Sequence, residues 1–269
     1  SGGIFGIRNW GMDSLTHTVL GACLGDLVAG KKLGKKAMLF GAIINNIPDI
    51  DAVCYLWMDP AEALLAHRGI THSIIFNGLM AFILANGLNK LFKKWHLPLS
   101  KWLLLTGTGL FTHLFLDTLN AYGTGLLEPF NSGRYSLNLL FILDPFFTVP
   151  LLTAAVVLLF LSTKNLKRKM WSKAALVLSS LYLLLGGVNK IYAARLVDRG
   201  IKQQGIEVYD YFISPTPLNN LLWHVVIKDG ENFYTGYCSV RDKEPPVFQK
   251  VLRNDSLLGP LKTTESVQN

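Results

Sequence analysis

Charged residues are scarce in this sequence. Asp, Glu, Lys and Arg make up 16% of the 269 residues, whereas 50% are hydrophobic and the mean hydropathy is +0.32. So little charge excludes an ordinary water-soluble domain, which needs a polar surface around its core. The composition instead indicates an integral protein that crosses a membrane several times.

Cysteine and histidine are also few, and the absence of certain motifs excludes several kinds of metal site. The three cysteines are an odd number without a Cys-x-x-Cys pair, so we expect neither a disulfide framework nor a cysteine-based zinc site. The absence of a His-Glu-x-x-His motif argues against a standard zinc peptidase. The HRGITH segment has the spacing of one histidine box of a di-iron lipid desaturase, but six histidines are too few for a complete set.

Apolar segments long enough to cross a bilayer, which takes about 20 helical residues, recur along the first 190 residues. They lie at roughly 14–30, 37–57, 73–91, 102–121, 139–162 and 174–190. The first is short and contains Asp26, so it is either a partial span or a helix packed inside the protein. The sequence therefore predicts an all-α polytopic membrane protein with about five to six membrane helices.

Basic residues concentrate in alternate loops. The loops after the first, third and fifth apolar segments hold 13 of the 26 Lys and Arg residues, and the two loops between them hold only Arg68 and Arg134. Because positively charged loops tend to stay in the cytoplasm, we expect both chain ends and these two loops with few basic residues on the opposite side of the membrane. Half of the positive charge is explained in this way, so nucleic-acid binding is not expected despite a pI of about 9.3.

The chain is expected to divide into four parts. Residues 1–11 stand before Met12 and are predicted to be an added leader, and residues 12–190 are predicted to form the membrane-embedded domain. Residues 191–253 are predicted to form a small extracytoplasmic α/β domain, because a polar helical stretch is followed by strand-like segments within 206–240. Residues 254–269 read as a polar tail.

Ionisable side chains beside the apolar segments are the most informative feature, because they are costly near a membrane interior and usually mark function. If the loop charges set the topology, the candidates fall on the side opposite the basic loops. They form four pairs along the chain: Asp13 and His17, Asp49 and Asp51, His67 and His72, and His113 and Asp117. Structural or solvated roles are expected instead for Asp26, Asp144, His96 and His224.

The spacing of these pairs suits metal binding. Residues four apart share one face of a helix, so His113 and Asp117 can present an imidazole and a carboxylate to one ion. The same spacing relates Asp13 and His17. Pro48 interrupts the second apolar segment and lets the PDID turn direct two carboxylates from non-helical backbone. Four imidazoles and four carboxylates exceed the needs of one tetrahedral zinc and fit two or three ions with a shared aspartate.

The HRGITHS segment at 67–73 adds features of its own. Gly69 is expected to give a tight turn, and Arg68 is the natural partner of a phosphate or another oxyanion. Thr71 or Ser73 can cap the next helix. Three of the six histidines follow a threonine, whose hydroxyl can hydrogen-bond a ligand carboxylate or ring nitrogen.

Five spaced motifs, in order along the chain, carry a family resemblance. The sequence resembles the YdjM-like family of membrane-bound metal-dependent hydrolases at DSLTH (13–17), PDID (48–51), HRGITHS (67–73), HLFLDTLNAYGT (113–124) and SPTPLNNLLWHVV (214–226). That family is similar, through its His and Asp pattern, to the zinc-dependent phospholipase C and P1-nuclease group. The resemblance implies a metallohydrolase acting on a phosphate ester. Phospholipase C enzymes of this group use the N-terminal amine as a zinc ligand; the residues before Met12 put that ligand in doubt, and Asp13 and His17 are the candidates to replace it.

The leading hypothesis is a membrane-embedded phosphohydrolase or phospholipase C-like enzyme with a lipid substrate. It is expected to be an integral multi-pass protein of the plasma membrane, the inner membrane of a bacterium, with its site on the extracytoplasmic side. The expected cofactor is zinc, as two or three ions, with manganese or iron as alternatives. Asp51 or Asp49 is the expected general base, and Arg68 is expected to stabilise the developing charge.

Two other functions stay open. A transmembrane zinc amidase acting on a lipid amide would use similar ligands, but Arg68 and the paired carboxylates favour phosphate chemistry. A non-enzymatic protein that binds or transports a divalent cation would also use them. A transporter places its ligands near the bilayer midplane, however, whereas these are predicted near one surface.

Overall fold

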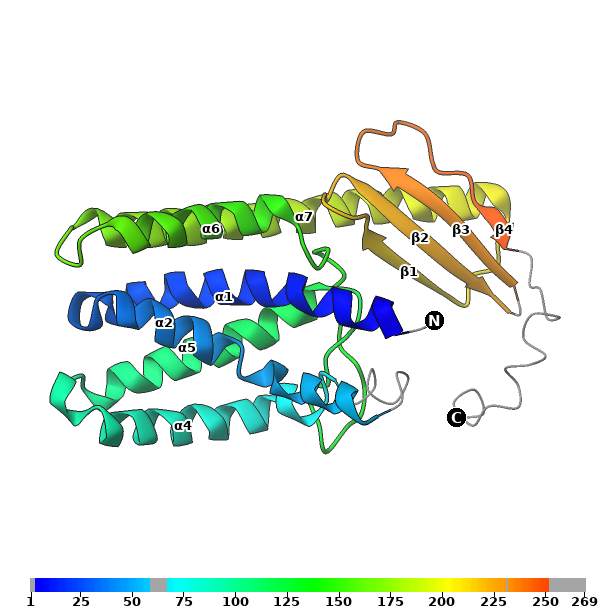
Figure 1. The fold of residues 1–269 in the computed structure, drawn as a ribbon. Helices are drawn as coiled ribbons and strands as arrows, with labels where there is room; N and C mark the ends of the chain where they lie inside the picture. The colour runs from blue at the N-terminus through cyan, green and yellow to red at the C-terminus, as the bar shows by residue number, and fades with distance from the viewer. Residues whose placement is uncertain (1–2, 59–66, 231, 252–269) are drawn as a thin grey trace.

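The computed structural model describes residues 3–58, 67–230 and 232–251 and consists of a helical bundle with a small β-sheet at one end (Figure 1). The helices, with η marking 3-10 helices, are α1 (Gly3–Leu33), α2 (Lys35–Asn45), η1 (Pro48–Leu56), η2 (Ile70–His72), α4 (Ile74–Leu91), η3 (Lys93–Trp95), α5 (Leu99–Leu119), α6 (Pro145–Phe160) and α7 (Lys167–Gln204). The strands are β1 (Asp210–Pro215), β2 (Leu222–Asp229), β3 (Asn232–Ser239) and β4 (Gln249–Val251).

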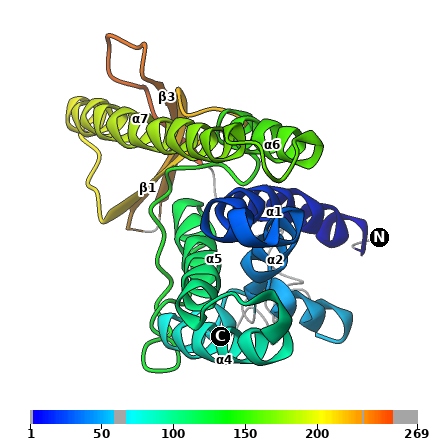
Figure 2. The same cartoon turned by 90° about the vertical axis from the view of Figure 1, so that its left-hand side faces the viewer.

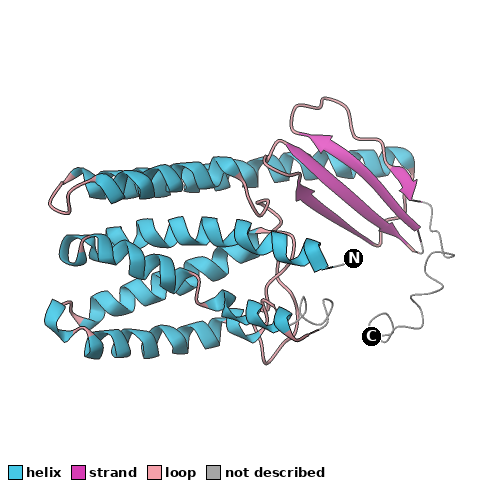
Figure 3. Cartoon of the chain, viewed as in Figure 1, coloured by secondary structure: helices cyan, strands magenta, loops and turns pink. Residues whose placement is uncertain are grey.

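Helix α1 lies at the centre of the bundle. It contacts α2, α5, α6 and α7, and the end view shows it between the α6–α7 pair and the α4–α5 pair (Figure 2). One apolar cluster joins Cys23 of α1 with Leu116 of α5 and Leu151 of α6, and a second buries Trp102 and Ala85 between α5 and α4. The helical bundle and the C-terminal strands predicted from the sequence are therefore confirmed (Figure 3).

The number of membrane helices is smaller than expected. Among the described residues, α4 and α7 are long and apolar enough to cross a membrane, and α2 with the 48–54 part of η1 is a third candidate, bent by 50°. Five to six spans are not supported. Helix α6 has only 16 residues because Asp144 caps its first turn and residues 139–144 are not helical. Helices α1 and α5 are longer, but α1 contains several charged residues and the polar side chains of α5 include Lys101, His113 and Asp117.

Helices α1 and α2 pack backbone to backbone. A Cβ atom on Gly41 of α2 would lie 2.0 Å from the carbonyl oxygen of Gly21 on α1, and one on Gly25 would lie 2.1 Å from the carbonyl oxygen of Ala37. Only glycine lets the two backbones approach so closely, as small residues do between membrane helices. This contact fixes the position of α2, and of the chain that follows it, beside α1.

A buried ion pair connects α1 with α7. Asp26 accepts hydrogen bonds from Arg168 Nε at 3.1 Å, from Arg168 Nη2 and from Ser172 Oγ at 3.2 Å. Arg168 also donates to the carbonyl oxygens of Leu158 and Leu161 at the end of α6. Because these bonds compensate both charges, burial of the pair is tolerated. Asp26 therefore has the structural role expected for it.

The antiparallel sheet packs on the C-terminal half of α7. Its strand order is β1-β2-β3-β4, and Trp223, Val225 and Ile227 of β2 form a buried core with Val197 of α7. The three strands predicted within 206–240 are confirmed, and Gly230 at the predicted turn has a φ of 53°. Strand β4 was not predicted. Since α7 is continuous from the bundle to the sheet, one helix connects the two parts (Figure 1).

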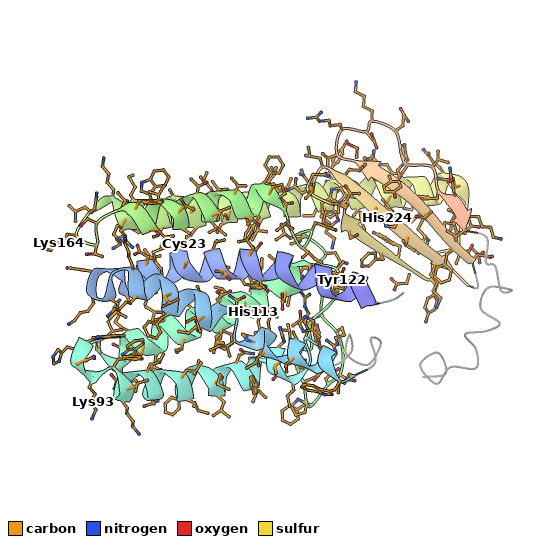
Figure 4. All side chains as sticks on the ribbon, in the orientation of Figure 1. Cys23, Lys93, His113, Tyr122, Lys164 and His224 are labelled. Atoms are coloured by element: carbon orange, nitrogen blue, oxygen red, sulfur yellow. The ribbon has the colours of Figure 1, made fainter. Side chains whose placement is uncertain are left out.

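The two ends of the bundle differ in charge. The basic loops lie at the end away from the sheet, where Lys93 and Lys164 are labelled in Figure 4. The chain around 67–73 and the loop at 120–144 lie at the other end of the bundle, the end that carries the sheet (Figure 1). The basic loops and the loops with few basic residues therefore lie at opposite ends of the bundle, as the alternating loop charges predicted.

Substitution of Gly41 by Ala should destabilise the bundle, because the added methyl group would collide with the α1 backbone. We expect the free energy of unfolding to fall by about 1–3 kcal/mol. Gly87→Ala in α4 is the matched control, since a Cβ there would have no heavy atom within 4 Å. Thermal unfolding of both variants in detergent checks this, and equal melting temperatures would contradict the close helix contact.

Candidate metal centre

Four parts of the chain meet inside the bundle, toward the end that carries the sheet. They supply His17 from α1, Asp49 and Asp51 from η1, His67, Arg68 and His72 from the chain around η2, and His113 and Asp117 from α5. Figure 4 shows His113 in the interior of the bundle. The structure thus brings these predicted residues into one region, and the side chain of Asp13 lies outside the described part of the structure.

Local sequence explains how η1 and η2 reach this region. Pro48 stops α2, and the chain bends and continues as a 3-10 helix with both aspartates of PDID in its first turn. Ser73 then caps α4, as its Oγ accepts a hydrogen bond from Phe76 N at 3.2 Å. The residue with positive φ in this loop is Arg68, at 63°, whereas Gly69 has a φ of −85°. The tight turn expected at Gly69 is therefore made one residue earlier.

Two imidazole nitrogens and two carboxylate oxygens face a common point. His72 Nε2 and His113 Nε2 are 3.1 Å apart, and Asp117 Oδ2 lies 3.1 Å from the first and 3.3 Å from the second. Asp49 Oδ1 lies 3.5 Å from each nitrogen. Atoms at the corners of a tetrahedron around zinc, with bonds of about 2.0–2.1 Å, are about 3.3 Å apart. These four side chains could therefore hold one metal ion nearly as they stand.

Asp117 gives the strongest support for a cation at this point. It is 1% exposed, and neither of its carboxylate oxygens meets a donor with hydrogen-bond geometry within the described residues. Nitrogen atoms of four side chains nevertheless lie 3.1–3.4 Å from these oxygens: those of His17, His72, His113 and Arg68. For the three imidazoles, close approach without aligned hydrogens is typical of ligands that share an ion, whereas Arg68 pairs with the buried carboxylate as a cation.

The carboxylates also favour positive charge at His72. Burial lowers the pKa of this imidazole, but the neighbouring carboxylates of Asp117, Asp49 and Asp51 outweigh burial and hold the pKa well above its usual value. A metal cation supplies positive charge at the same place without a proton.

A second group of ligands adjoins the first and shares Asp49 with it. One ligand atom from each of Asp49, Asp51 and His67 lies within 4.8 Å of the others. The side chains of Asp49 and His67 are 20% and 21% exposed, so this group opens toward the surface while the first is buried. An aspartate common to two ligand groups is the arrangement expected for adjacent ions.

Asp51 organises the loop before α4. Its Oδ1 lies 2.7 Å from His67 Nδ1, and its Oδ2 accepts hydrogen bonds from the Arg68 N–H at 3.1 Å and from the Thr71 hydroxyl. His72 Nδ1 lies 3.2 Å from the same Oδ2 and 3.0 Å from Thr71 Oγ1. The proton of a neutral His72 is then on Nδ1, where it points to these oxygens and away from the cluster. Nε2 of His72 is left to act as a metal ligand. At Thr71, the contact expected between a threonine hydroxyl and ligand residues is present.

Asn45 orients His17 in a similar way. Its Nδ2 donates to the carbonyl oxygen of Gly109 at 2.8 Å and to Thr112 Oγ1 at 3.0 Å, so its Oδ1 faces His17 Nδ1 at 3.2 Å. The proton of a neutral His17 is then on Nδ1, and Nε2 presents a lone pair 3.3 Å from Asp117 Oδ1. Asn45 was not among the predicted site residues, and only its place just before the PDID motif could have drawn attention to it.

Arg68 lies against the cluster. Its guanidinium donates to Asn120 Oδ1 at 2.7 Å and lies 3.4 Å from Asp117 Oδ1, and its Cζ lies 5.6 Å from the centre of the Tyr122 ring. Arg134 donates to the carbonyl oxygen of Arg68 at 2.8 Å and holds the loop from the other side. The three residues that hold Arg68 were not predicted as site residues, because they come from the loop after α5, where no helical or strand periodicity applies.

Comparison with known proteins gives the chain a family. The family described as YdjM inner membrane protein matches residues 12–193, a range that includes every predicted site residue. The chain belongs to the YdjM inner membrane protein family. Membership of the YdjM family, together with the apolar helices α4 and α7, identifies a membrane protein.

Two relatives with curated sequences are similar to this YdjM-family chain. The uncharacterized protein YfhP of Bacillus subtilis (strain 168) is 29% identical over 239 residues, which cover 84% of this chain and 68% of YfhP. The inner membrane protein YbcI of Escherichia coli (strain K12) is 27% identical over 125 residues, which cover 45% of this chain and 69% of YbcI. No solved structure matches the chain.

The purified protein should bind at least one equivalent of a divalent transition metal. His72→Gln and His113→Gln each remove a nitrogen from the buried group, so we expect both variants to lose most of the metal measured by inductively coupled plasma mass spectrometry. His224→Gln is the control, because His224 lies on β2 and contacts Thr235 outside the cluster. Equal metal contents in all four proteins, or none after incubation with zinc or manganese, would contradict the assignment.

Proposed function

We propose that this YdjM-family protein is a membrane-embedded, metal-dependent hydrolase of phosphate esters with a lipid substrate. The observation that carries the proposal is the position of Arg68, whose buried guanidinium lies 3.4 Å from Asp117 at the edge of the His and Asp cluster. Arginine recognises phosphate oxygens through paired, charge-assisted hydrogen bonds. The scissile bond of a lipid amide carries no negative charge, so it offers no comparable partner for this guanidinium.

The cluster residues have distinct roles in the proposed reaction. When bound, divalent cations would polarise a phosphoryl oxygen and make a water molecule more acidic. His72, His113 and Asp117 would hold the metal ion of the buried ligand group. Asp49 belongs to both ligand groups. Arg68 stabilises the negative charge that develops on the phosphoryl oxygens. Because the buried ligands are shielded from bulk water, these electrostatic interactions are stronger than at an exposed surface.

Asp49 and Asp51 have different roles in the proposed site. Both oxygens of Asp51 are engaged with donors from His67 to His72, so this carboxylate positions the loop. Asp49 is more exposed than Asp51, at 20% against 10%, and lies between the two ligand groups. We therefore assign Asp49 to hold the ions that would make the water more acidic, and we assign a positioning role to Asp51.

The location of the cluster favours a lipid substrate. The loops around it lie opposite the basic loops, and positively charged loops tend to stay in the cytoplasm (Figures 1 and 4). The proposed enzyme therefore acts at the extracytoplasmic surface. Ile70, Ile74 and Phe130 are 52%, 44% and 81% exposed in this region, and acyl chains would cover them. Zinc is the proposed metal, as two ions that share Asp49.

The protein loaded with zinc or manganese should release phosphate or a phosphorylated headgroup from phospholipid vesicles. Arg68→Lys keeps the charge but loses the paired donors, so we expect kcat to fall by about a hundredfold with unchanged metal content. His113→Gln should lose both metal and activity, and His224→Gln should keep both. Headgroup release and bound metal are measured on the same samples.

Three outcomes would contradict parts of this proposal. Hydrolysis of a lipid amide, with phosphate esters left intact, would instead establish an amidase. Bound metal without hydrolysis of either substrate would favour a metal-binding protein that is not an enzyme. Full activity of Arg68→Lys would remove the role assigned to the paired donors of this arginine.

The proposed orientation is tested with single cysteines. The three native cysteines are buried and are replaced by serine, and Asn131→Cys or Lys94→Cys then places one thiol in an exposed loop at either end of the bundle. A membrane-impermeant maleimide should label Asn131→Cys in intact cells and Lys94→Cys only after permeabilisation. The reverse pattern would place the cluster on the cytoplasmic side.

A further inference from the structure

The basic end of the bundle contains a cavity that takes no part in the proposed reaction. It has a volume of about 330 Å³ and is lined by Lys31, Lys32, Leu33, Lys36 and Trp95. These residues come from the end of α1, the start of α2 and the short helix η3. Figure 4 shows Lys93 of η3 at the end of the bundle away from the sheet, whereas His113 lies in its interior. The cavity is therefore distinct from the candidate metal centre.

The lining of this cavity is cationic. Three of its five lining residues are lysines, and none is acidic. Lys36 lies in the first turn of α2, and the Gly34 cap of this helix offers no side-chain acceptor to the backbone N–H groups. The start of α2 contributes partial positive charge and the end of α1, which also borders the cavity, contributes partial negative charge, so the net positive charge comes from the lysines. An anion is the complementary ligand.

Trp95 forms an aromatic wall of the cavity. The Lys36 ammonium lies 4.7 Å from the centre of the Trp95 ring, and this ring stacks on Phe92 with centroids 4.2 Å apart. These contacts hold the tryptophan and the lysine together at the cavity. Tryptophan is enriched at the level of lipid headgroups, so this wall indicates that the cavity lies at the membrane surface.

An apolar strip runs along α2 from the cavity. Leu39 and Ile43 follow Lys36 at successive spacings of three and four residues, which places all three on one helix face. Leu39 is 59% exposed and Ile43 is 54% exposed. Because α2 is part of a candidate membrane span, this strip is expected to face acyl chains next to the cavity. A phospholipid would cover it with an acyl chain while its phosphate occupies the cavity.

We propose that this cavity binds the phosphate group of an anionic phospholipid, with an acyl chain against Leu39 and Ile43. The basic end is the end expected in the cytoplasm, where anionic lipids give the membrane a negative surface potential. The inference does not depend on the proposed hydrolase, because the cavity and the metal centre share no residue.

Native mass spectrometry of the full chain tests the proposal, with an equimolar mixture of phosphatidylglycerol and phosphatidylcholine in detergent. The parent protein should retain phosphatidylglycerol preferentially. Lys32→Gln/Lys36→Gln should weaken this binding about 25-fold, since each lysine near an anionic surface contributes about fivefold. Lys169→Gln/Lys173→Gln is the matched control, because it removes the same charge from exposed positions of α7 that do not line the cavity. This control should bind like the parent.

The alternatives give different results. Equal losses in the two double variants would indicate a diffuse basic surface and would overturn the proposal. Displacement of phosphatidylglycerol by the same concentration of glycerol phosphate or inorganic phosphate would show that the acyl chain contributes nothing, and would overturn the lipid assignment. Both double variants should keep the metal content of the parent, so a loss of lipid with normal metal content reports on the cavity rather than on misfolding.

Discussion

A carboxylate in the interior of an apolar bundle is stable only with positive charge beside it, and Asp117 places this requirement on the whole structure. Asp117 is 1% exposed, and Leu114 and Leu116 beside it on the same helix are also buried. Nitrogen atoms reach it from α1, from η2 and from the Arg68 side chain. Two parts of the chain that are distant in sequence from α5 must therefore pack around a single side chain.

Close helix packing makes this convergence possible. The glycine contact between α1 and α2 brings the end of α2 near the middle of the bundle, where Asn45 bonds to His17 on one side and to Gly109 on the other. Gly109 is needed at that point, since a Cβ there would lie 2.7 Å from Ile44 Cγ2. Pro48 then turns the chain toward η2. The contacts that hold the helices together thus also set the positions of the candidate metal ligands.

Features that depend on local geometry could be predicted from the sequence, and features that depend on tertiary contacts could not. The i, i+4 pair on α5 and the two carboxylates after a helix-stopping proline follow from spacing alone. The start of α6 was missed, although Asp144 followed by Pro145 inside the apolar run at 139–162 is a local signal of a helix N-terminus. Arg68 takes the positive φ because its N–H, guanidinium and carbonyl oxygen each bind a different partner: Asp51, Asn120 and Arg134. Those partners are brought together only by the fold.

The sheet is connected to the candidate metal centre through the loop after α5. Lys190 of α7 donates to the carbonyl oxygen of Leu137 at 2.6 Å, and the Leu137 N–H donates to the carbonyl oxygen of Thr118, next to Asp117. In the same loop, Arg134 holds the backbone of Arg68. Helix α7 runs without a break from the bundle to the half on which the sheet packs. Movement of the sheet relative to the bundle would therefore disturb these bonds. The position of the arginine at the cluster therefore depends on the C-terminal part of the chain as well as on the helices that carry the ligands.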